Sequence, residues 1–180
     1  MKIAVDNLCV YDPGFSGYGE GFPNEMGGSS ASEPVSKIDD LIAVFGKYCM
    51  VKYLEVGLHG SPGMIWFANN GVMVGSYIGV LATKANVLQR EARVLFASCN
   101  IAEGARGDEF MTELGKNMFT GKGGIAAGAT VSNVVFLAKF RLASAPFMSP
   151  LNNGLLKVRR YDVNGDQIGQ RSTDAYGNFH

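Results

Sequence analysis

The sequence predicts an α/β fold, a three-layer α/β/α sandwich with a largely parallel central sheet and a C-terminal β-hairpin. Apolar runs of strand length alternate along the chain with segments whose apolar residues recur at helical spacing. The run at 93–98 is almost continuously apolar, as expected for a strand covered on both faces. The length of 180 residues predicts one domain, residues 1–180.

The N-terminal part is predicted to be a strand, a long loop and a helix. Residues 2–11 alternate loosely between polar and apolar and predict the strand. Residues 12–36 are rich in Gly, Ser and Pro, which predicts a loop that is either mobile or functional. Residues 33–48 carry apolar side chains at helical spacing and predict the helix, with Ser32 or Ser36 as its N-cap.

The rest of the chain alternates between predicted strands and helices. A hairpin with Asn70-Gly71 at its turn is predicted after the strand at 51–58. A C-terminal hairpin is predicted over 155–171, with its turn at Asn164-Gly165. The remaining predicted helices are 77–89 and 103–119, and the remaining predicted strands are 93–98, 125–131 and 134–142.

Charge and cysteine content argue against several classes of function. The chain has 16 basic and 16 acidic residues, so no basic excess indicates nucleic-acid binding. No apolar stretch approaches the ~20 residues of a membrane helix, and the N-terminus lacks a signal-peptide pattern. Cys9, Cys49 and Cys99 are too few and too widely spaced for a disulfide framework. We therefore expect a cytoplasmic protein, or an effector secreted without a signal peptide, that contacts no membrane and whose oligomeric state is open.

Two predicted strands end at residues that can carry out nucleophilic catalysis. His59, the only internal histidine, follows the strand at 51–58, and Cys99 follows the strand at 93–98. Parallel sheets place reactive groups beyond the carboxyl ends of their strands. If the two strands are neighbours, their Cα atoms lie about 5 Å apart, or about 10 Å apart with one strand between them. An imidazole beside a thiol can accept its proton and generate the nucleophilic thiolate.

Gly60 follows His59 and leaves its backbone N–H unhindered. Together with the N–H of Cys99 it would bind the oxyanion of a tetrahedral intermediate, an effect of about 3 kcal/mol per donor. A structural interpretation stays open for both candidate catalytic residues, because single histidines at strand ends and free cysteines in strands are common in protein cores.

The same residues carry a resemblance to a known family. The stretches "LEVGLHGSPG" and "RVLFASCNIAEGARGDEF" resemble the His-Gly and Cys blocks of the caspase-like cysteine peptidases of clan CD. The closest likeness is to a bacterial caspase-like domain found in large surface and repeat proteins. Its blocks correspond here to residues 59–63, 98–102 and 107–110, and the resemblance covers roughly residues 37 to 130.

The resemblance implies a caspase-like cysteine endopeptidase that acts through an acyl-enzyme. His59 would be the general base and acid, Cys99 the nucleophile, and the amides of Gly60 and Cys99 the oxyanion hole. The family has a strand–helix unit between its first strand and the helix before the His block, but residues 12–36 show no pattern for one. Ser98 also differs, because relatives often have Gly or Ala there.

The resemblance also suggests where the substrate pocket lies. In this clan the pocket draws on the loop after the first strand and on segments after the Cys. Asp6 and Asp12 lie in or near that loop and would favour an Arg or Lys side chain, unless they are solvated loop acids. Ser98 and Trp66, the single tryptophan, are further candidates, with hairpin packing as the alternative role of Trp66.

Other kinds of site find little support in the sequence. "GKNMFTGKGG" lacks the spacing and the Ser/Thr of a phosphate-binding loop, and no Cys-x-x-Cys pair indicates a metal, so we expect no cofactor and no metal. The expected partner is a protein or peptide substrate, with self-cleavage at the 12–36 loop or the "TGKGG" turn as one case. The alternatives are a catalytically silent caspase-like interaction module and a different thiol hydrolase, such as a transpeptidase or esterase.

Overall fold

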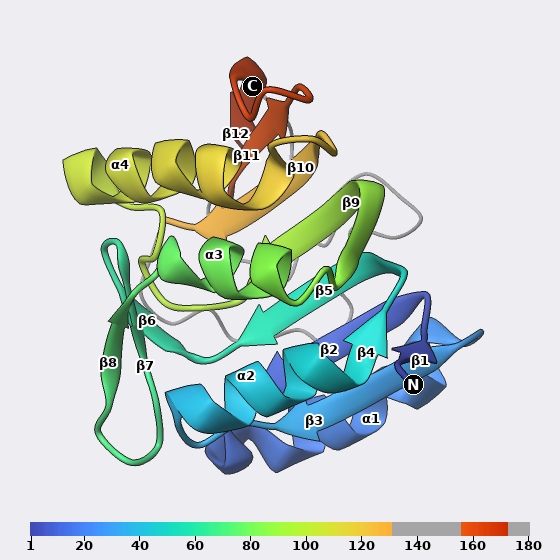
Figure 1. Ribbon diagram of the computed structural model, residues 1–180. Coiled ribbons are helices and arrows are strands. Elements are labelled where there is room, and N and C mark those ends of the chain that lie inside the picture. The colour runs from blue at the N-terminus through green and yellow to red at the C-terminus, as the bar shows by residue number, and fades with distance from the viewer. Residues whose placement is uncertain (131–155, 173–180) are drawn as a thin grey trace.

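The protein is built around one seven-stranded, mostly parallel sheet, which the computed structural model describes for residues 1–130 and 156–172 (Figure 1). In spatial order the strands are β12 (Gln167–Ser172), β11 (Leu156–Tyr161), β10 (Gly124–Ala129), β9 (Leu88–Phe96), β5 (Val51–Gly57), β2 (Asn7–Tyr11) and β3 (Ser30–Pro34). The five strands from β10 to β3 pair in parallel. The predicted C-terminal hairpin is confirmed as β11 and β12, which are antiparallel, with Gly165 in the left-handed region at the turn.

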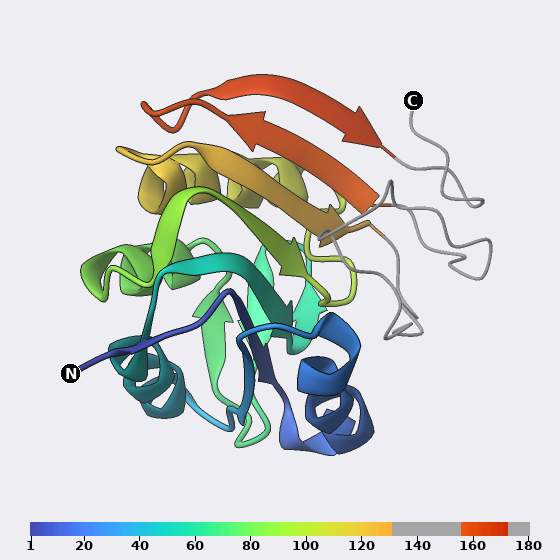
Figure 2. The same ribbon diagram turned by 90° about the vertical axis from the view of Figure 1, so that its right-hand side faces the viewer.

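Helices cover both faces of this sheet, as Figure 2 shows in a view turned from that of Figure 1. One face packs against α2 (Ile38–Lys47), α3 (Tyr77–Lys84) and α4 (Gly104–Leu114), and the other against α1 (Ser16–Met26). Strand residues alternate between the two apolar clusters: Leu54 and Val56 face the larger one, whereas Tyr53 packs in the smaller one with Phe22 of α1. The α/β prediction with a largely parallel sheet is therefore confirmed.

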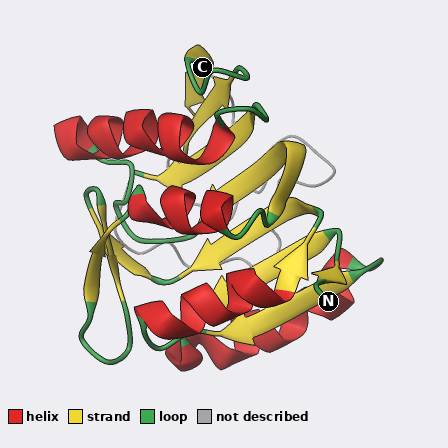
Figure 3. Cartoon of the chain, viewed as in Figure 1, coloured by secondary structure: helices red, strands yellow, loops and turns green. Residues whose placement is uncertain are grey.

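Two small sheets and two short helical turns complete the described structure (Figure 3). The first small sheet pairs β1 (Ile3–Ala4) with β4 (Tyr48–Cys49). The second contains β6 (His59–Ser61), β7 (Met64–Trp66) and β8 (Val72–Val74), and its β7–β8 arm confirms the hairpin predicted around Asn70-Gly71. The turns are η1 (Pro13–Phe15) and the π-helical η2 (Gly115–Phe119), which continues α4.

The prediction of a long loop over 12–36 is wrong, because this segment forms η1, α1 and β3. Helix α1 contains three glycines and Pro23, which have the lowest helix propensities. Tertiary packing overrides these propensities: Phe22 is fully buried and stacks on Tyr53 with ring centroids 6.3 Å apart. Gly19 lies directly on the Tyr11 ring, where an added Cβ would come within 2.2 Å. The apolar pattern of the sequence did not reveal β3, because β3 is a polar strand at the edge of the sheet.

Several predicted element boundaries were also wrong. The helix predicted over 33–48 begins only at Ile38, because Glu33 and Pro34 end β3. The helix predicted over 77–89 ends at Lys84, since Asn86 turns the chain with φ 48°. The strand predicted over 2–11 is split into β1 and β2, and the strand proposed over 134–142 lies outside the described residues. In the described part of the chain no helix has the length and apolarity needed to span a membrane.

Candidate active site

β5 and β9 are neighbours in the main sheet and run parallel, so they end at the same edge. The register pairs Val56 with Phe96 at that edge. His59 begins β6 two residues after the end of β5, and Cys99 follows the end of β9 by three residues. The two strands are therefore direct neighbours, which is the condition for the prediction that His59 and Cys99 lie close together.

The glycines of the His block pack against the backbone of the Cys block. A Cβ added to Gly60 would lie 2.8 Å from the Cβ of Ser98 and 2.9 Å from the carbonyl oxygen of Cys99. A Cβ added to Gly63 would lie 3.1 Å from the carbonyl oxygen of Arg106. The N–H of Gly63 also donates to the carbonyl oxygen of Ile101 at 3.0 Å. The β6–β7 hairpin is thus fixed directly onto the segment that carries Cys99.

Cys99 itself lies on a tight turn between β9 and α4 and is half-buried. Asn100, the next residue, has φ 55°, the left-handed region that non-glycine residues adopt mostly in special turns. Among the described residues, the backbone N–H of Cys99 donates to no backbone acceptor. No hydrogen bond within the described residues joins the Cys99 thiol to the His59 ring.

Buried polar atoms without partners concentrate around this turn. Across residues 1–130 and 156–172, the buried side-chain oxygens that lack a hydrogen bond are Asp12 Oδ2, Ser98 Oγ and Asn100 Oδ1. Ser98 and Asn100 flank Cys99, and Asp12 lies at the end of β2, the strand next to β5. Such groups are rare in folded proteins because each costs about 1–3 kcal/mol, and they commonly mark functional sites.

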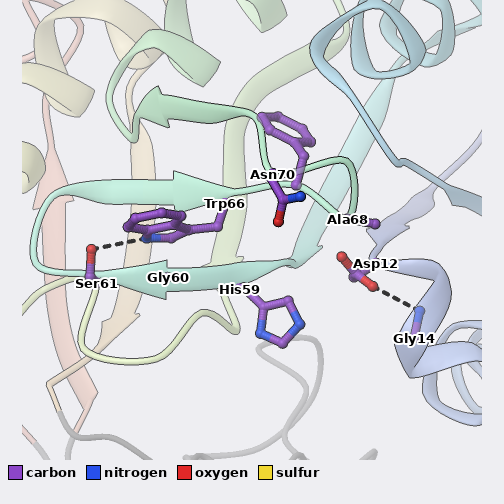
Figure 4. Close-up of a pocket in the computed structure, with 9 residues that line it drawn as sticks. Asp12, Gly14, His59, Gly60, Ser61, Trp66, Ala68 and Asn70 are labelled. Carbon is purple, nitrogen blue, oxygen red and sulfur yellow. Dashed lines mark hydrogen bonds between the residues drawn. The ribbon is translucent and has the colours of Figure 1, made fainter.

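A cleft of about 740 Å³ opens beside β6, and its lining includes four of the predicted site residues: Asp12, His59, Gly60 and Trp66. The lining residues are Asp12, Gly14, His59, Gly60, Ser61, Trp66, Phe67, Ala68 and Asn70, most of which Figure 4 labels. The exposed imidazole of His59 packs on Phe15, with ring centroids 4.7 Å apart. Cys99 does not line this cleft and is linked to it through Gly60.

Asp12 is the single acidic residue among the described residues that line the cleft, and it is almost fully buried, with 3% of its surface exposed. Its Oδ1 accepts a hydrogen bond from the N–H of Gly14 at 2.7 Å, as the dashed line in Figure 4 marks. Its own N–H donates to the carbonyl oxygen of Gly57, which ties it to the end of β5. The second carboxylate oxygen has no partner. The described lining of the cleft therefore includes a carboxylate that has one oxygen without a hydrogen-bond partner.

Trp66 forms one wall of the cleft on β7 and keeps 43% of its surface exposed. It pairs with His59 across the β6–β7 ladder, and its Nε1–H donates to Ser61 Oγ at 3.1 Å (Figure 4). This bond holds the indole over β6, so the residue serves both the hairpin and the cleft.

Two of the predicted pocket residues do not join this group. Asp6 precedes β2, at the opposite end of that strand from Asp12, and forms an ion pair with Lys52 at 2.7 Å, so the structure does not bring it to the cleft. Ser98 is completely buried, so its side chain is closed to a substrate, although it underlies Gly60.

The sequence also missed Phe15, which packs on His59, and the turn at Phe67–Asn70, which lines the cleft. The one clue in the sequence to the turn at Phe67–Asn70 was the Asn70-Gly71 turn signal, which follows closely after His59. Among the described residues no three His, Cys, Asp or Glu side chains gather in a group able to hold a metal ion. Comparison of the chain with protein-family models, with curated proteins and with solved structures found no match in any of the three.

Proposed function

We propose that the protein is a caspase-like cysteine endopeptidase in which Cys99 is the nucleophile and His59 the general base and acid. The observation that carries this proposal is the backbone contact of Gly60 with Ser98 and Cys99, at the shared edge of two neighbouring parallel strands. This contact packs Gly60, the residue after His59, against Cys99, which carries the thiol. The β2–α1–β3 unit adds support, because the family resemblance implies a unit of this kind before the His block.

The proposed chemistry is peptide hydrolysis in two steps. His59 accepts the proton of the Cys99 thiol while the sulfur attacks the scissile carbonyl carbon, and the oxyanion is held by the N–H groups of Gly60 and Cys99. The imidazolium gives its proton to the leaving amine, which produces an acyl-enzyme and the first product. Water, deprotonated by His59, then releases the second product and restores the thiol.

Asp12 suggests the substrate preference of this site. Its unpaired Oδ2 lies in a buried position beside the cleft that His59 lines. A guanidinium or ammonium group of a substrate would satisfy that oxygen through a charge-assisted hydrogen bond. We therefore propose that the enzyme prefers an Arg or Lys residue next to the scissile bond.

A non-catalytic interaction module is the second candidate, and a specific observation favours it. Cys99 does not line the cleft, and no described hydrogen bond joins its thiol to the His59 ring. A module of this type would bind a polypeptide in the cleft and leave it uncut. Loose geometry in a free enzyme does not decide between the two, because catalytic hydrogen bonds often tighten only when substrate binds.

An acyl probe that reacts with activated thiols, combined with a peptide library, tests the proposal. We expect wild type to be labelled at Cys99 and to cleave peptides, and Cys99→Ala to do neither. The matched control is Cys49→Ala, which removes the other half-buried described thiol, and it should behave as wild type. Equal behaviour of wild type and Cys99→Ala in both assays rejects the peptidase. Peptide binding without cleavage by both proteins would establish the interaction module instead.

A further inference from the structure

A second hollow of about 910 Å³ lies at the opposite end of the main-sheet strands from the cleft. The parallel strands begin at this end, near the N-terminus marked in Figure 1. Its basic lining residues come from separate elements: Lys2 from the N-terminal segment, Lys84 from α3, Arg90 from β9 and Lys122 from the turn before β10. None of the described residues that line it is acidic. The chain as a whole has no net charge, so the hollow concentrates positive charge that the rest of the molecule balances elsewhere.

These four basic side chains differ from most others in the described structure. Lys47, Lys52, Lys116, Lys157, Arg159 and Arg160 each form an ion pair with a carboxylate. None of the four in the hollow pairs with a carboxylate of the described residues.

Backbone oxygens hold two of the ammonium groups in place. Lys2 Nζ donates to the carbonyl oxygens of Phe45 and Ala85, near the C-terminal ends of α2 and α3. Lys122 Nζ donates to the carbonyl oxygen of Leu88 and to Asn86 Oδ1, the latter at 2.8 Å. Each ammonium group keeps a third N–H that these bonds do not use.

Helix dipoles offset only part of this charge. The C-terminal end of a helix carries about half a negative charge, so the ends of α2 and α3 together contribute about −1 against four positive side chains. Partial burial lowers the pKa of Lys122, and no carboxylate acts in the opposite direction. The hollow thus gathers four positive side chains that form no ion pair with a described carboxylate.

We propose that this hollow binds a small molecule that carries a chain of two or more phosphate groups. Several linked phosphates deliver three or four negative charges within a short length, which matches four cations spread around one cavity, whereas a single carboxylate matches only one. Lys and Arg are the usual protein ligands of phosphate oxygens. The volume lies within the range of small-molecule sites, and Met50 and Leu88 add apolar surface for an attached organic group.

Isothermal titration calorimetry of the full chain with sodium tripolyphosphate, ATP and sulfate, at constant ionic strength, tests this inference. We expect tripolyphosphate to bind at least about tenfold more tightly than sulfate, because it engages several cations at once. Tighter binding of ATP than of tripolyphosphate would identify a nucleotide as the ligand. Equal or weaker binding of ATP would identify an inorganic or differently substituted oligophosphate.

Arg90→Gln and Lys122→Gln should each weaken tripolyphosphate binding about tenfold or more. Arg90 is exposed, so its variant keeps the test valid even if Lys122→Gln unfolds. The matched control is Lys37→Gln, which removes an exposed, unpaired lysine at the other end of α2. The inference is overturned if tripolyphosphate binds no better than sulfate, or if Lys37→Gln weakens binding as much as Arg90→Gln. Both outcomes are independent of any peptidase activity.

Discussion

The backbone of Gly60 lies against the carbonyl oxygen of Cys99, so closely that a Cβ on Gly60 would come within 2.9 Å of it. Gly60, the residue after His59, is therefore packed directly against the backbone of Cys99. Any side chain at position 60 must displace the turn that carries the thiol.

Replacing Gly60 by alanine should therefore damage both stability and activity. We expect Gly60→Ala to lower the free energy of unfolding by about 1–3 kcal/mol, the usual cost of overpacking, and to reduce peptide cleavage because Cys99 shifts. Urea denaturation and cleavage kinetics measure the two effects. Gly169→Ala is the control, since an added Cβ there would meet nothing within 4 Å. Wild-type stability of Gly60→Ala would contradict the packing described.

His59→Gln tests the proposed base while preserving a polar side chain in the cleft. Loss of general acid–base catalysis typically lowers the rate 10²–10⁴-fold, roughly, so we expect kcat for peptide cleavage to fall by that order with KM little changed. Because His59 is exposed, we expect the variant to fold as wild type does, which circular dichroism checks. A rise in KM with kcat unchanged would assign His59 to substrate binding instead.

Asp12→Asn should remove the preference for basic substrates. The variant replaces the buried carboxylate of the cleft by a neutral amide of the same shape, so the ratio of kcat/KM for Arg over Leu peptides should fall about tenfold or more. Asp6→Asn provides the comparison, because Asp6 lies at the other end of β2 and pairs with Lys52. An unchanged ratio in Asp12→Asn, or an equal change in Asp6→Asn, would exclude Asp12 as the selecting group.

Trp66 offers a direct signal for binding in the cleft. It is the single tryptophan of the chain and its exposed indole lines the cleft, so a bound peptide should shield it from water. We expect the emission of the Cys99→Ala variant to shift to shorter wavelength when a peptide containing Arg is added. Binding detected by calorimetry without any change of emission would locate the peptide elsewhere.

The ion pairs between α4 and β11 should make stability depend on acid pH. The hydrogen bond from Lys157, with support from Arg159, lowers the pKa of Asp108, whose carboxylate lies 2.7 Å and 2.5 Å from the two cations. A lowered folded pKa adds stability above the ordinary carboxyl pKa of about 3.9, and this stability is lost as the pH falls through the folded value.

Asp108→Asn should therefore lower Tm at pH 7 and much less at pH 2.5. Because half of the Asp108 side chain is exposed, we expect about 1 kcal/mol at pH 7, or about 2–4 °C. Lys116→Gln is the control, since it breaks an ion pair in which both partners are exposed and should change Tm by less. An equal loss for Asp108→Asn at both pH values would show that packing, not charge, is responsible.

Sequence patterns predicted the strands that are buried on both faces, because such strands require continuous apolar runs. They failed where tertiary contacts replace local preference. Helix α1 depends on burial of Phe22 and on the glycine that meets the Tyr11 ring, and neither contact is visible in the periodicity of 12–36. The start of β9 was hidden by polar residues around Glu91, which has φ 55° and interrupts the regular strand.

The candidate site was predicted in part for a similar reason. His59, Gly60 and Cys99 follow apolar strands, and strand ends can be read from a sequence. The roles of the two N-terminal acids could not be separated in that way, since both flank β2. Only the sheet shows that Asp12 follows the carboxyl end of that strand and Asp6 precedes its amino end.

β9 is a nine-residue strand that contributes Leu88 to the basic hollow at its first residue and leads to Cys99 beyond its last. The register pairs Leu88 with Val51 and Phe96 with Val56 of β5, so at about 3.3 Å per residue roughly 17 Å separates the two ends of β9. The two sites lie beyond opposite ends of this strand, so an inhibitor that alkylates the thiol leaves the distant cavity vacant, and a ligand in the cavity leaves the thiol uncovered. The affinity of the hollow for its ligand can therefore be measured before and after Cys99 is alkylated. Any difference between the two affinities measures the coupling between the two sites through the sheet.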